Sequence, residues 1–235
     1  MLSVKDGKVV VPLKYHEILS DYIEDFDNLI NEVEVKELLI AAYWMDCWEQ
    51  EGLPTPDTIL IKLDELKLPL IFDRPKFIRL NSLSDKTGKS YLTFTQEDLI
   101  SLLTNERCQT SIQMANRIHR DVYLVIRDFI DLSNGVEYRC FIYEEKLRAI
   151  ALNDTKDSDI NNEELVTRAS TLLDQCLYSL PCCDCVMDIW IGINTDLLIE
   201  FNSYGYWGQA GSGPFDWITD SAQLYGLLPG VEVRR

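Results

Sequence analysis

Residues 185–202 read CVMDIWIGINTDLLIEFN, two apolar runs joined by a short polar segment at 194–196. Valine, isoleucine, leucine and aromatic residues dominate both runs, which is the composition of β-strands. The Asn, Thr and Asp between them favour a tight turn. The stretch therefore predicts an antiparallel β-hairpin, and the polar side chains that interrupt its apolar runs are the first candidates for function.

Asp188, Glu200 and Asn202 interrupt the two predicted strands. A hairpin centred on Asn194 pairs Asp188 with Glu200, and Asn202 follows two residues later on the same strand face. Two carboxylates on a buried face repel each other and lose hydration unless a hard cation lies between them. Two carboxylates and an amide suit Mg²⁺, which takes its other ligands from water and phosphate. The hairpin thus predicts a magnesium site.

The same pattern also fits a solvated sheet face that carries Glu200 and Asn202, because antiparallel sheets often expose one polar face. Two features favour the metal site. Apolar residues flank Asp188 on both sides, and residues 203–214 combine four glycines with three aromatic rings. Such a composition is typical of an ordered loop close to a ligand.

The chain has 235 residues, of which 46% are hydrophobic. This length suits one large domain or two small ones with an ample core. No segment reaches the roughly 20 uncharged residues that a membrane-spanning helix needs. Residues 1–14 alternate charges with valines and lack the apolar core of a signal peptide. We therefore expect a cytoplasmic or nuclear protein, with the cytoplasm as the first choice, that does not act on a membrane.

The seven cysteines include a cluster, Cys182, Cys183 and Cys185, that could suggest zinc. No second cysteine pair accompanies it, and the two histidines, His16 and His119, are distant in sequence. An odd cysteine count without a signal peptide favours free thiols. We expect structural thiols, and the sequence shows no Ser-His-Asp or Cys-His arrangement.

The net charge of −17 opposes binding to a nucleic acid. The charge is unevenly distributed along the chain. Residues 74–150 have 12 basic and 10 acidic side chains, whereas residues 1–73 have 6 basic and 16 acidic ones and residues 151–235 have 4 basic and 13 acidic ones. This segregation fits either a partner-facing surface or a pocket for an anion. ATP is the anion to test first, because the carboxylate cluster could hold its metal.

The order of the predicted elements indicates an α+β fold. Apolar spacing predicts helices over 15–31, 35–50, from 95 onward, 163–180 and 216–227. Strand composition predicts strands over 77–80, 122–130, 138–142 and 147–152, ahead of the hairpin. Helices followed by antiparallel strands with one inserted helix differ from an alternating parallel sheet. Neither a P-loop nor a G-x-G-x-x-G segment is present.

Ordered motifs over residues 77–217 resemble the cell-division-cycle protein 123 family, a divergent branch of the ATP-grasp fold. They are FIRLN (77–81) with SDK (84–86), LVIRDF (124–129), EYRCFI (137–142), LRAIALN (147–153), DIW (188–190), IEFN (199–202) and FDW (215–217). The resemblance implies an ATP-grasp-like α+β fold of two lobes with mainly antiparallel sheets and the nucleotide between them. The implied parts are a helical N-terminal region (1–75), a small lobe (76–120) and a large lobe with the metal site (121–235).

The resemblance also implies residue roles. Asp188, Glu200 and Asn202 would hold a Mg²⁺ that bridges ATP phosphates. The ATP contacts would be Arg79, Asp85, Lys86, Arg127, Asp128, Phe129, Ile130 and Arg139. Arg79 and Arg139 would contact phosphates, and the backbone of 127–130 would meet the adenine edge. A simpler alternative pairs Arg127 and Arg139 with nearby carboxylates at a sheet edge, namely Asp128, Asp131 or Glu137.

Several residues depart from the family pattern. Arg79 replaces a lysine, Glu200 an aspartate, Ser203 a proline and Leu152 a glutamine, and the 203–214 loop is longer than usual. Arginine keeps the charge of lysine but changes its donor geometry, and glutamate still ligates a metal. ATP binding is compatible with these changes, whereas the partner or substrate need not be the same.

Three functions remain open from the sequence. The first is an ATP-dependent assembly chaperone, like the eukaryotic members of the resembled family that help assemble translation initiation factor 2 through its GTPase gamma subunit. The second is an ATP-dependent ligase or phosphotransferase that acts on a carboxylate or another small acceptor. The third is a scaffold with a degenerate nucleotide pocket, favoured by Arg79 and Leu152.

Overall fold

A computed structural model of the chain divides into two compact units at the boundary between Ile130 and Asp131. It describes residues 3–5, 8–10, 58–81, 96–117, 121–154, 156, 159–180, 183–205 and 211–235. The helices predicted over 15–31 and 35–50 lie outside these residues, as do Asp85 and Lys86. The domain boundaries given above stay a prediction.

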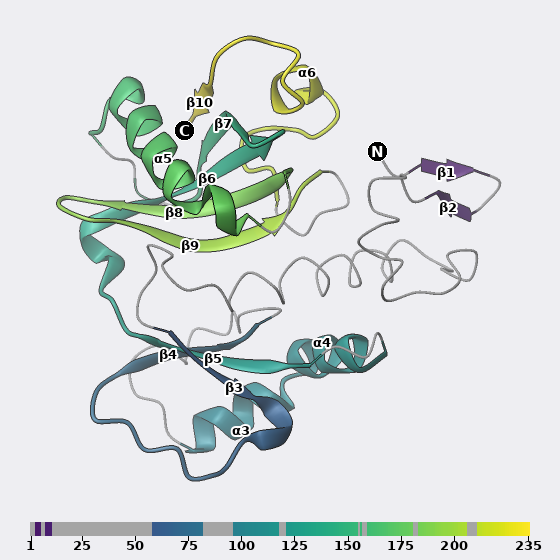
Figure 1. Cartoon of the computed structure of the whole chain (residues 1–235), viewed down its shortest axis with the longest axis vertical. Helices are drawn as coiled ribbons and strands as arrows, with labels where there is room; N and C mark the ends of the chain where they lie inside the picture. The colour runs from purple at the N-terminus through teal and green to yellow at the C-terminus, as the bar shows by residue number, and fades with distance from the viewer. Residues whose placement is uncertain are drawn as a thin grey trace. The chain divides into compact units, whose positions relative to one another are not determined.

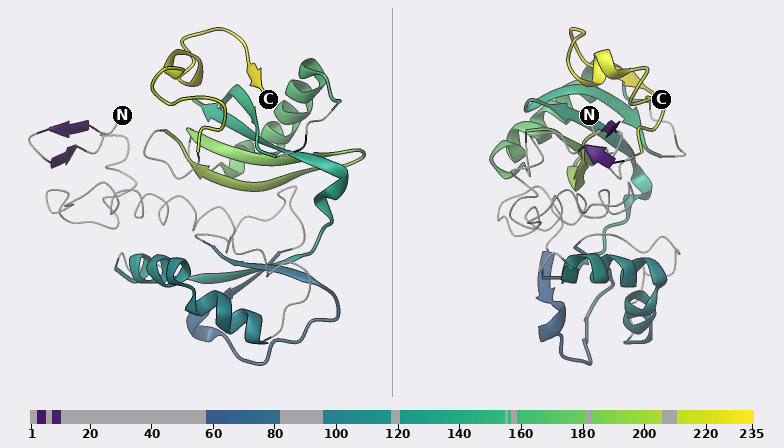
Figure 2. Two further views of the ribbon diagram at one scale, coloured as in Figure 1. Left: turned by 180° about the vertical axis from the view of Figure 1, so that it is seen from behind. Right: turned by 90° about the vertical axis from the view of Figure 1, so that its right-hand side faces the viewer.

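Unit 1 contains a three-stranded antiparallel sheet in the order β3-β5-β4. Its strands are β3 (Thr58–Lys62), β4 (Lys76–Leu80) and β5 (Tyr123–Asp128), and a 3-10 turn, η2 (Leu63–Glu65), follows β3. Helices α3 (Gln96–Thr104) and α4 (Glu106–Arg117) lie on one side of this sheet (Figure 2). A separate hairpin pairs β1 (Ser3–Lys5) with β2 (Lys8–Val10).

The core of unit 1 lies between that sheet and its two helices. Ile78, Leu80 and Leu124 point from the sheet towards Leu99 and Leu102 of α3, and all five are at most 2% exposed. Because side chains alternate along a strand, the intervening residues of β4 and β5 face the opposite side. That side carries the arginines discussed below.

Unit 2 contains a five-stranded sheet in the order β10-β7-β6-β8-β9 (Figure 1). Its strands are β6 (Gly135–Tyr143), β7 (Lys146–Leu152), β8 (Cys185–Gly192), β9 (Asp196–Ser203) and β10 (Glu232–Arg234). Its helical elements are η3 (Leu132–Asn134), α5 (Asn162–Cys176), η4 (Leu177–Ser179) and α6 (Ser221–Leu224). All pairs are antiparallel except β10 with β7, which is parallel.

Apolar packing secures this sheet. Helix α5 contacts β7 and β9 and buries an apolar stripe that includes Leu165, Ala169 and Leu172. The C-terminal segment packs aromatic rings against β6, where Phe141 meets Phe215 and Trp217 edge to face at centroid distances of 5.5 and 5.3 Å. The polar residues of the hairpin therefore lie in a sheet that is held rigidly by packing.

The β8–β9 hairpin has the predicted pairing at the site but a different turn. The turn closes over four residues, with the Gly192 amide donating to the Thr195 carbonyl at 3.0 Å. Ile189 pairs with Leu198 and Asp188 with Glu200, so Ile199 is an extra residue in β9. This β-bulge places Glu200 directly opposite Asp188.

The predicted α+β class with mainly antiparallel sheets is confirmed. Strand β3, helix α4 and strand β10 were not predicted, and the helix predicted over 216–227 is wrong in length, because α6 has only four residues. Asp216 instead caps a turn by accepting hydrogen bonds from the amides of Ile218 and Thr219. No helix of the described segments is long and apolar enough to cross a membrane.

Candidate functional site

A row of charged residues crosses the five-stranded sheet on three neighbouring strands. Arg139 of β6 lies opposite Asp188 of β8, which in turn lies opposite Glu200 of β9. Residues directly opposite each other in an antiparallel pair share a face, so the three side chains emerge on the same side. Asn202, two residues beyond Glu200, joins them. The structure therefore brings together all three predicted metal ligands and one predicted phosphate contact.

The Asp188 carboxylate is almost completely buried, with 1% of the residue exposed. Arg139 donates from Nε to Oδ1 at 2.8 Å and from Nη2 to Oδ2 at 2.7 Å. Asn202 donates from Nδ2 to Oδ2 at 3.1 Å. This is a bidentate, charge-assisted pair, the strongest geometry available to a guanidinium and a carboxylate.

The electrostatics of this row are set by burial and by mutual proximity. Burial raises the pKa of the Asp188 carboxyl, and the hydrogen bonds from Arg139 oppose that rise, whereas the charge of Glu200 adds to it. Burial alone would lower the pKa of Arg139, but the hydrogen bonds and charge of Asp188 raise it overall. The arginine is therefore a permanent positive charge beside two acidic groups.

Glu137 is a third acidic group on the same side, two residues before Arg139 in β6. Burial, followed by the charge of Asp188, raises the pKa of Glu137 to about 7. Asn153 donates a hydrogen bond from its side chain to the Glu137 carboxyl group. Glu137 was not among the predicted site residues, although its spacing of two residues from Arg139 in β6 is the signal that places it on this face.

The end of the glycine-rich loop also reaches the site. Arg139 donates from Nη1 to the Gly211 carbonyl oxygen at 2.7 Å. At Gly213, where φ is +58°, an added Cβ would lie 3.3 Å from the Ala151 side chain. A glycine is therefore favoured here by both conformation and space. Residues 206–210 of the loop lie outside the described residues, and its predicted closeness to a ligand stays a prediction.

The donor set suits a hard divalent cation. Two carboxylates and one amide, from Asp188, Glu200 and Asn202, supply the oxygen ligands that Mg²⁺ prefers. No cluster of three or more His, Cys, Asp or Glu side chains suited to a metal occurs in the described part of the chain. The predicted ligand set has two carboxylates, and its third member is the amide of Asn202. The alternative pairing of Arg139 with a carboxylate also occurs, but its partner is Asp188 rather than Asp131 or Glu137.

Unit 1 brings two of the predicted ATP contacts together. Arg79 lies opposite Val125, two residues from Arg127, so both arginines are on the sheet face opposite α3 and α4. They are 4% and 5% exposed. Arg79 donates from Nε to the Leu80 carbonyl at 3.1 Å. The unit thus holds two buried guanidinium groups on one face.

The Asp128 carboxylate forms ion pairs with two cationic side chains of unit 1. Lys76 and Arg74 both contact its carboxylate, Arg74 at 2.6 Å, and the hydrogen bond from Lys76 lowers the pKa of Asp128. The backbone amide of Phe129 donates to the Pro75 carbonyl at 3.3 Å. Ile130 is the last residue of unit 1.

Comparison with known proteins assigns the family. The family model described as D123 matches residues 90–218, more than half of the chain. The chain belongs to the D123 family. A putative CDC123-like protein L884 of Acanthamoeba polyphaga mimivirus is 34% identical over 137 residues, which are 52% of this chain and 41% of that relative. The match spans less than half the length of this relative. The family predicted from the motifs is confirmed.

Solved structures support the same fold. C-terminally truncated Cdc123 from Schizosaccharomyces pombe has a TM-score of 0.62 at 18% identity, covering 86% of this chain and 96% of that one. Cdc123 from the same organism has a TM-score of 0.60 at 17% identity over the same shares of the two chains. These TM-scores show that the chain shares the fold of the two Cdc123 structures.

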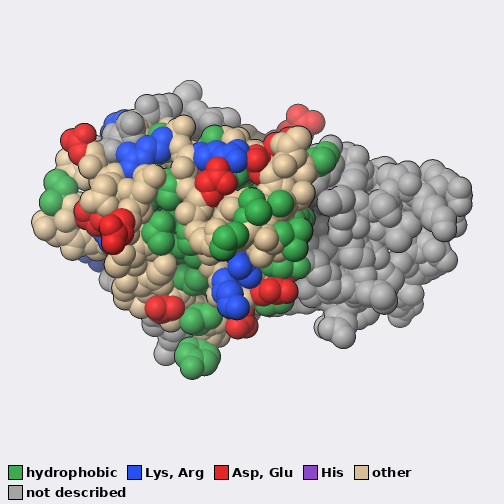
Figure 3. Space-filling view, turned by 90° about the horizontal axis from the view of Figure 1, so that it is seen from above, with side chains coloured by type: hydrophobic (Ala, Val, Ile, Leu, Met, Phe, Trp, Pro, Cys, Tyr) green, Lys and Arg blue, Asp and Glu red, His purple; other side chains and the backbone are tan. Residues whose placement is uncertain are grey.

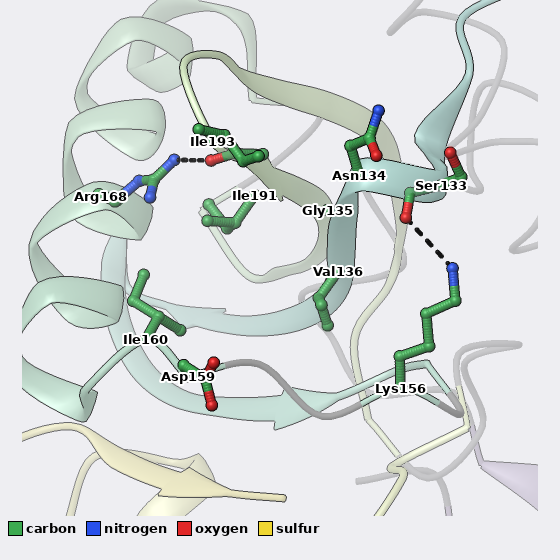
Figure 4. A pocket seen from close by; sticks show the side chains of 11 residues that line it. Ser133, Asn134, Gly135, Val136, Lys156, Asp159, Ile160, Arg168, Ile191 and Ile193 are labelled. Carbon is green, nitrogen blue, oxygen red and sulfur yellow. Dashed lines mark hydrogen bonds between the residues drawn. The ribbon is translucent and has the colours of Figure 1, made fainter.

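A second feature of this D123 chain is a hollow of about 430 Å³ at the turn end of the hairpin (Figure 4). Its two basic side chains are engaged with protein atoms. Lys156 donates to the Ser133 carbonyl at 3.3 Å, and Arg168 pairs with Asp196 and donates to the Gly192 carbonyl. The charged row on β6, β8 and β9 remains the candidate site, because it brings together the two carboxylates and the amide that the sequence predicts as metal ligands.

The cysteines are consistent with the structural role predicted for them. Cys108, Cys140, Cys176 and Cys185 are buried and Cys183 is exposed, and none of these five described cysteines forms a disulfide. Burial raises the pKa of Cys176 to about 11, so this thiol is protonated at neutral pH. Cys182, the remaining member of the predicted cluster, lies outside the described residues.

Proposed function

We propose that this chain binds Mg·ATP, with the cation held by Asp188, Glu200 and Asn202 and a phosphate contacted by Arg139. The observation that carries the proposal is the buried bidentate pair of Arg139 with Asp188, flanked by Glu200 directly across the sheet. A bound Mg²⁺ would neutralise these carboxylates and the phosphate oxygens together. The guanidinium fork matches phosphate as well as it matches carboxylate.

Residues of unit 1 complete the proposed nucleotide contacts. Arg79 and Arg127 provide buried positive charge on one sheet face, and Asp85 and Lys86 are assigned from the family motif alone. The Asp128 carboxylate is already paired with Lys76 and Arg74. By resemblance, the backbone of residues 127–130 would meet the adenine edge; the Phe129 amide itself donates to the Pro75 carbonyl.

The biological role that we propose is ATP-dependent assembly of a protein partner in the cytoplasm. Membership of the D123 family supports a protein partner, and by resemblance the partner would be a GTPase like the gamma subunit of initiation factor 2. On the face in Figure 3, basic and acidic side chains alternate among exposed apolar ones. Such a mixed surface suits a protein better than a polyanion.

The site assignment is tested by calorimetric titration of Mg·ATP into wild-type chain and into Asp188→Asn and Glu200→Gln. Each variant removes one charge without changing side-chain volume, so we expect the affinity to fall by about tenfold or more. Asp196→Asn is the matched control, because Asp196 forms a bidentate pair with Arg168 at the far end of the same hairpin. Unchanged affinity in both site variants would refute the assignment.

A separate measurement tests the assembly role. We expect the chain to capture a purified initiation-factor GTPase subunit more tightly with Mg·ATP than without nucleotide, because a ligand that favours one state stabilises it. Release of ADP that depends on a small carboxylic acid and an amine would instead identify a ligase and contradict the assembly role.

A further inference from the structure

The Arg139 guanidinium occupies the oxygens that the proposed cation requires. Its Nε and Nη2 face both oxygens of Asp188 at 2.8 and 2.7 Å, while Nη1 reaches the Gly211 carbonyl at 2.7 Å. Only 13% of the arginine side chain and 1% of the aspartate side chain are exposed. The positive charge is therefore fixed in place and poorly screened by solvent.

A divalent ion bound to Asp188 would lie beside this guanidinium, and the two like charges repel strongly where water is largely excluded. Two changes relieve that repulsion. Either the guanidinium leaves Asp188, or an anion enters and contacts both cations. A phosphate group does the second, because it can ligate a metal and accept a guanidinium fork at once.

We infer that Arg139 makes the site selective for a metal–phosphate complex over the bare metal ion. The ion and the guanidinium compete for Asp188, and a phosphate ends the competition by giving Arg139 another partner. The inference rests on the proposed function, since it concerns the same site. By linkage, the nucleotide then raises the metal affinity by the same factor as the metal raises the nucleotide affinity.

Asn202 and Glu200 explain why the competition is centred on Asp188. Asn202 donates its amide hydrogen to Oδ2 of Asp188, and its amide oxygen is the atom that could ligate a cation. Glu200 contributes negative charge to both cations, as its effect on the pKa of Arg139 indicates. Asp188 is the residue that shares both of its oxygens with the arginine.

The test compares MnCl₂ alone with preformed Mn·ATP as titrants of the full chain at pH 8. In Arg139→Gln we expect Mn²⁺ alone to bind about tenfold more tightly, because its competitor is gone. We expect Mn·ATP to bind about tenfold more weakly, because a phosphate contact is lost. A residue with a purely structural role would not shift the two affinities in opposite directions.

Arg168→Gln is the matched control, since Arg168 also forms a bidentate aspartate pair in unit 2 but lies away from the row. Both affinities should stay at the wild-type values. Arg139→Lys keeps the charge and loses the fork, so it should shift both affinities in the same directions as Arg139→Gln, by less. This variant decides the question if circular dichroism shows that Arg139→Gln does not fold.

The outcomes separate the two hypotheses. If Asp188→Asn weakens Mn·ATP binding but neither Arg139 variant strengthens binding of Mn²⁺ alone, the inference of competition is wrong and the ATP site stands. If Asp188→Asn and Glu200→Gln leave Mn·ATP binding unchanged, the proposed function fails and the inference fails with it.

Discussion

Replacing Glu137 with glutamine should change how the stability of this protein depends on pH. Glutamine keeps the shape of the side chain and an oxygen that can accept the hydrogen bond from Asn153. It removes the carboxyl group, whose pKa is raised by burial and by the charge of Asp188. The pKa of Glu137 is raised to about 7 from an ordinary 4.5.

The sign follows from proton linkage. Between pH 4.5 and 7 the unfolded chain has lost the Glu137 proton while the folded chain retains it, so the free energy of unfolding falls as pH rises. Below pH 4.5 both states are protonated and the residue has no effect. Above pH 7 the destabilisation is complete, and the two pKa values correspond to about 3 kcal/mol.

Urea unfolding of wild-type chain and Glu137→Gln in EDTA, at pH 5 and pH 8, measures this difference. We expect the variant to gain roughly 2 to 3 kcal/mol on the wild type between the two pH values. Glu65→Gln, the same substitution at an exposed position, is the control. A constant difference between wild type and Glu137→Gln across this range would show that Glu137 ionises normally, and the electrostatic description of the site would be wrong.

Two further variants test the scaffold around the site by urea unfolding. Trp217→Ala should lower the free energy of unfolding by about 3 to 5 kcal/mol, because the ring is buried against Phe141 and Tyr204, and a loss below 1 kcal/mol would contradict the packing. Asn161→Ala should cost about 1 kcal/mol, because Asn161 caps α5 by accepting from the Glu164 amide at 2.9 Å; Asn161→Ser, which can still cap, is its control.

Most of the strands that could be predicted from the sequence have long apolar runs, and β4, predicted over 77–80, was found although Arg79 interrupts its short run. Strands β5 to β9 all have such runs, and α5 has an apolar stripe between its cap and Pro181. Strand β10 has three residues and is defined only by parallel pairing with β7, a contact distant in sequence. Helix α4 is largely polar, and its few core-facing apolar residues at helical spacing, Cys108, Ile112 and Ala115, were not recognised as a helix.

The site could be predicted only in part, because some of its residues come from strands that are distant in sequence. Asp188, Glu200 and Asn202 belong to one hairpin, so they are close in sequence, although the face that Glu200 takes depends on the bulge at Ile199. Arg139 and Glu137 reach the site because β6 lies beside β8, although some fifty residues separate Arg139 from Asp188 along the chain. No local sequence pattern predicts that β6 lies beside β8. The partner of Arg139 could therefore not be identified among several carboxylates.

The pairing of Asp188 with Glu200 was predicted correctly, although the prediction did not include the bulge at Ile199. The turn over residues 192–195 is centred between Ile193 and Asn194. Regular antiparallel pairing continued from this turn would place Ile199 opposite Asp188. Glu200 would then point to the other face of the sheet. The extra residue in β9 reverses this outcome and puts a second carboxylate beside a buried one, an arrangement that is unfavourable without a cation. The bulge therefore brings Glu200 onto the face where Arg139 pairs with Asp188, which is the arrangement that the proposed cation site requires.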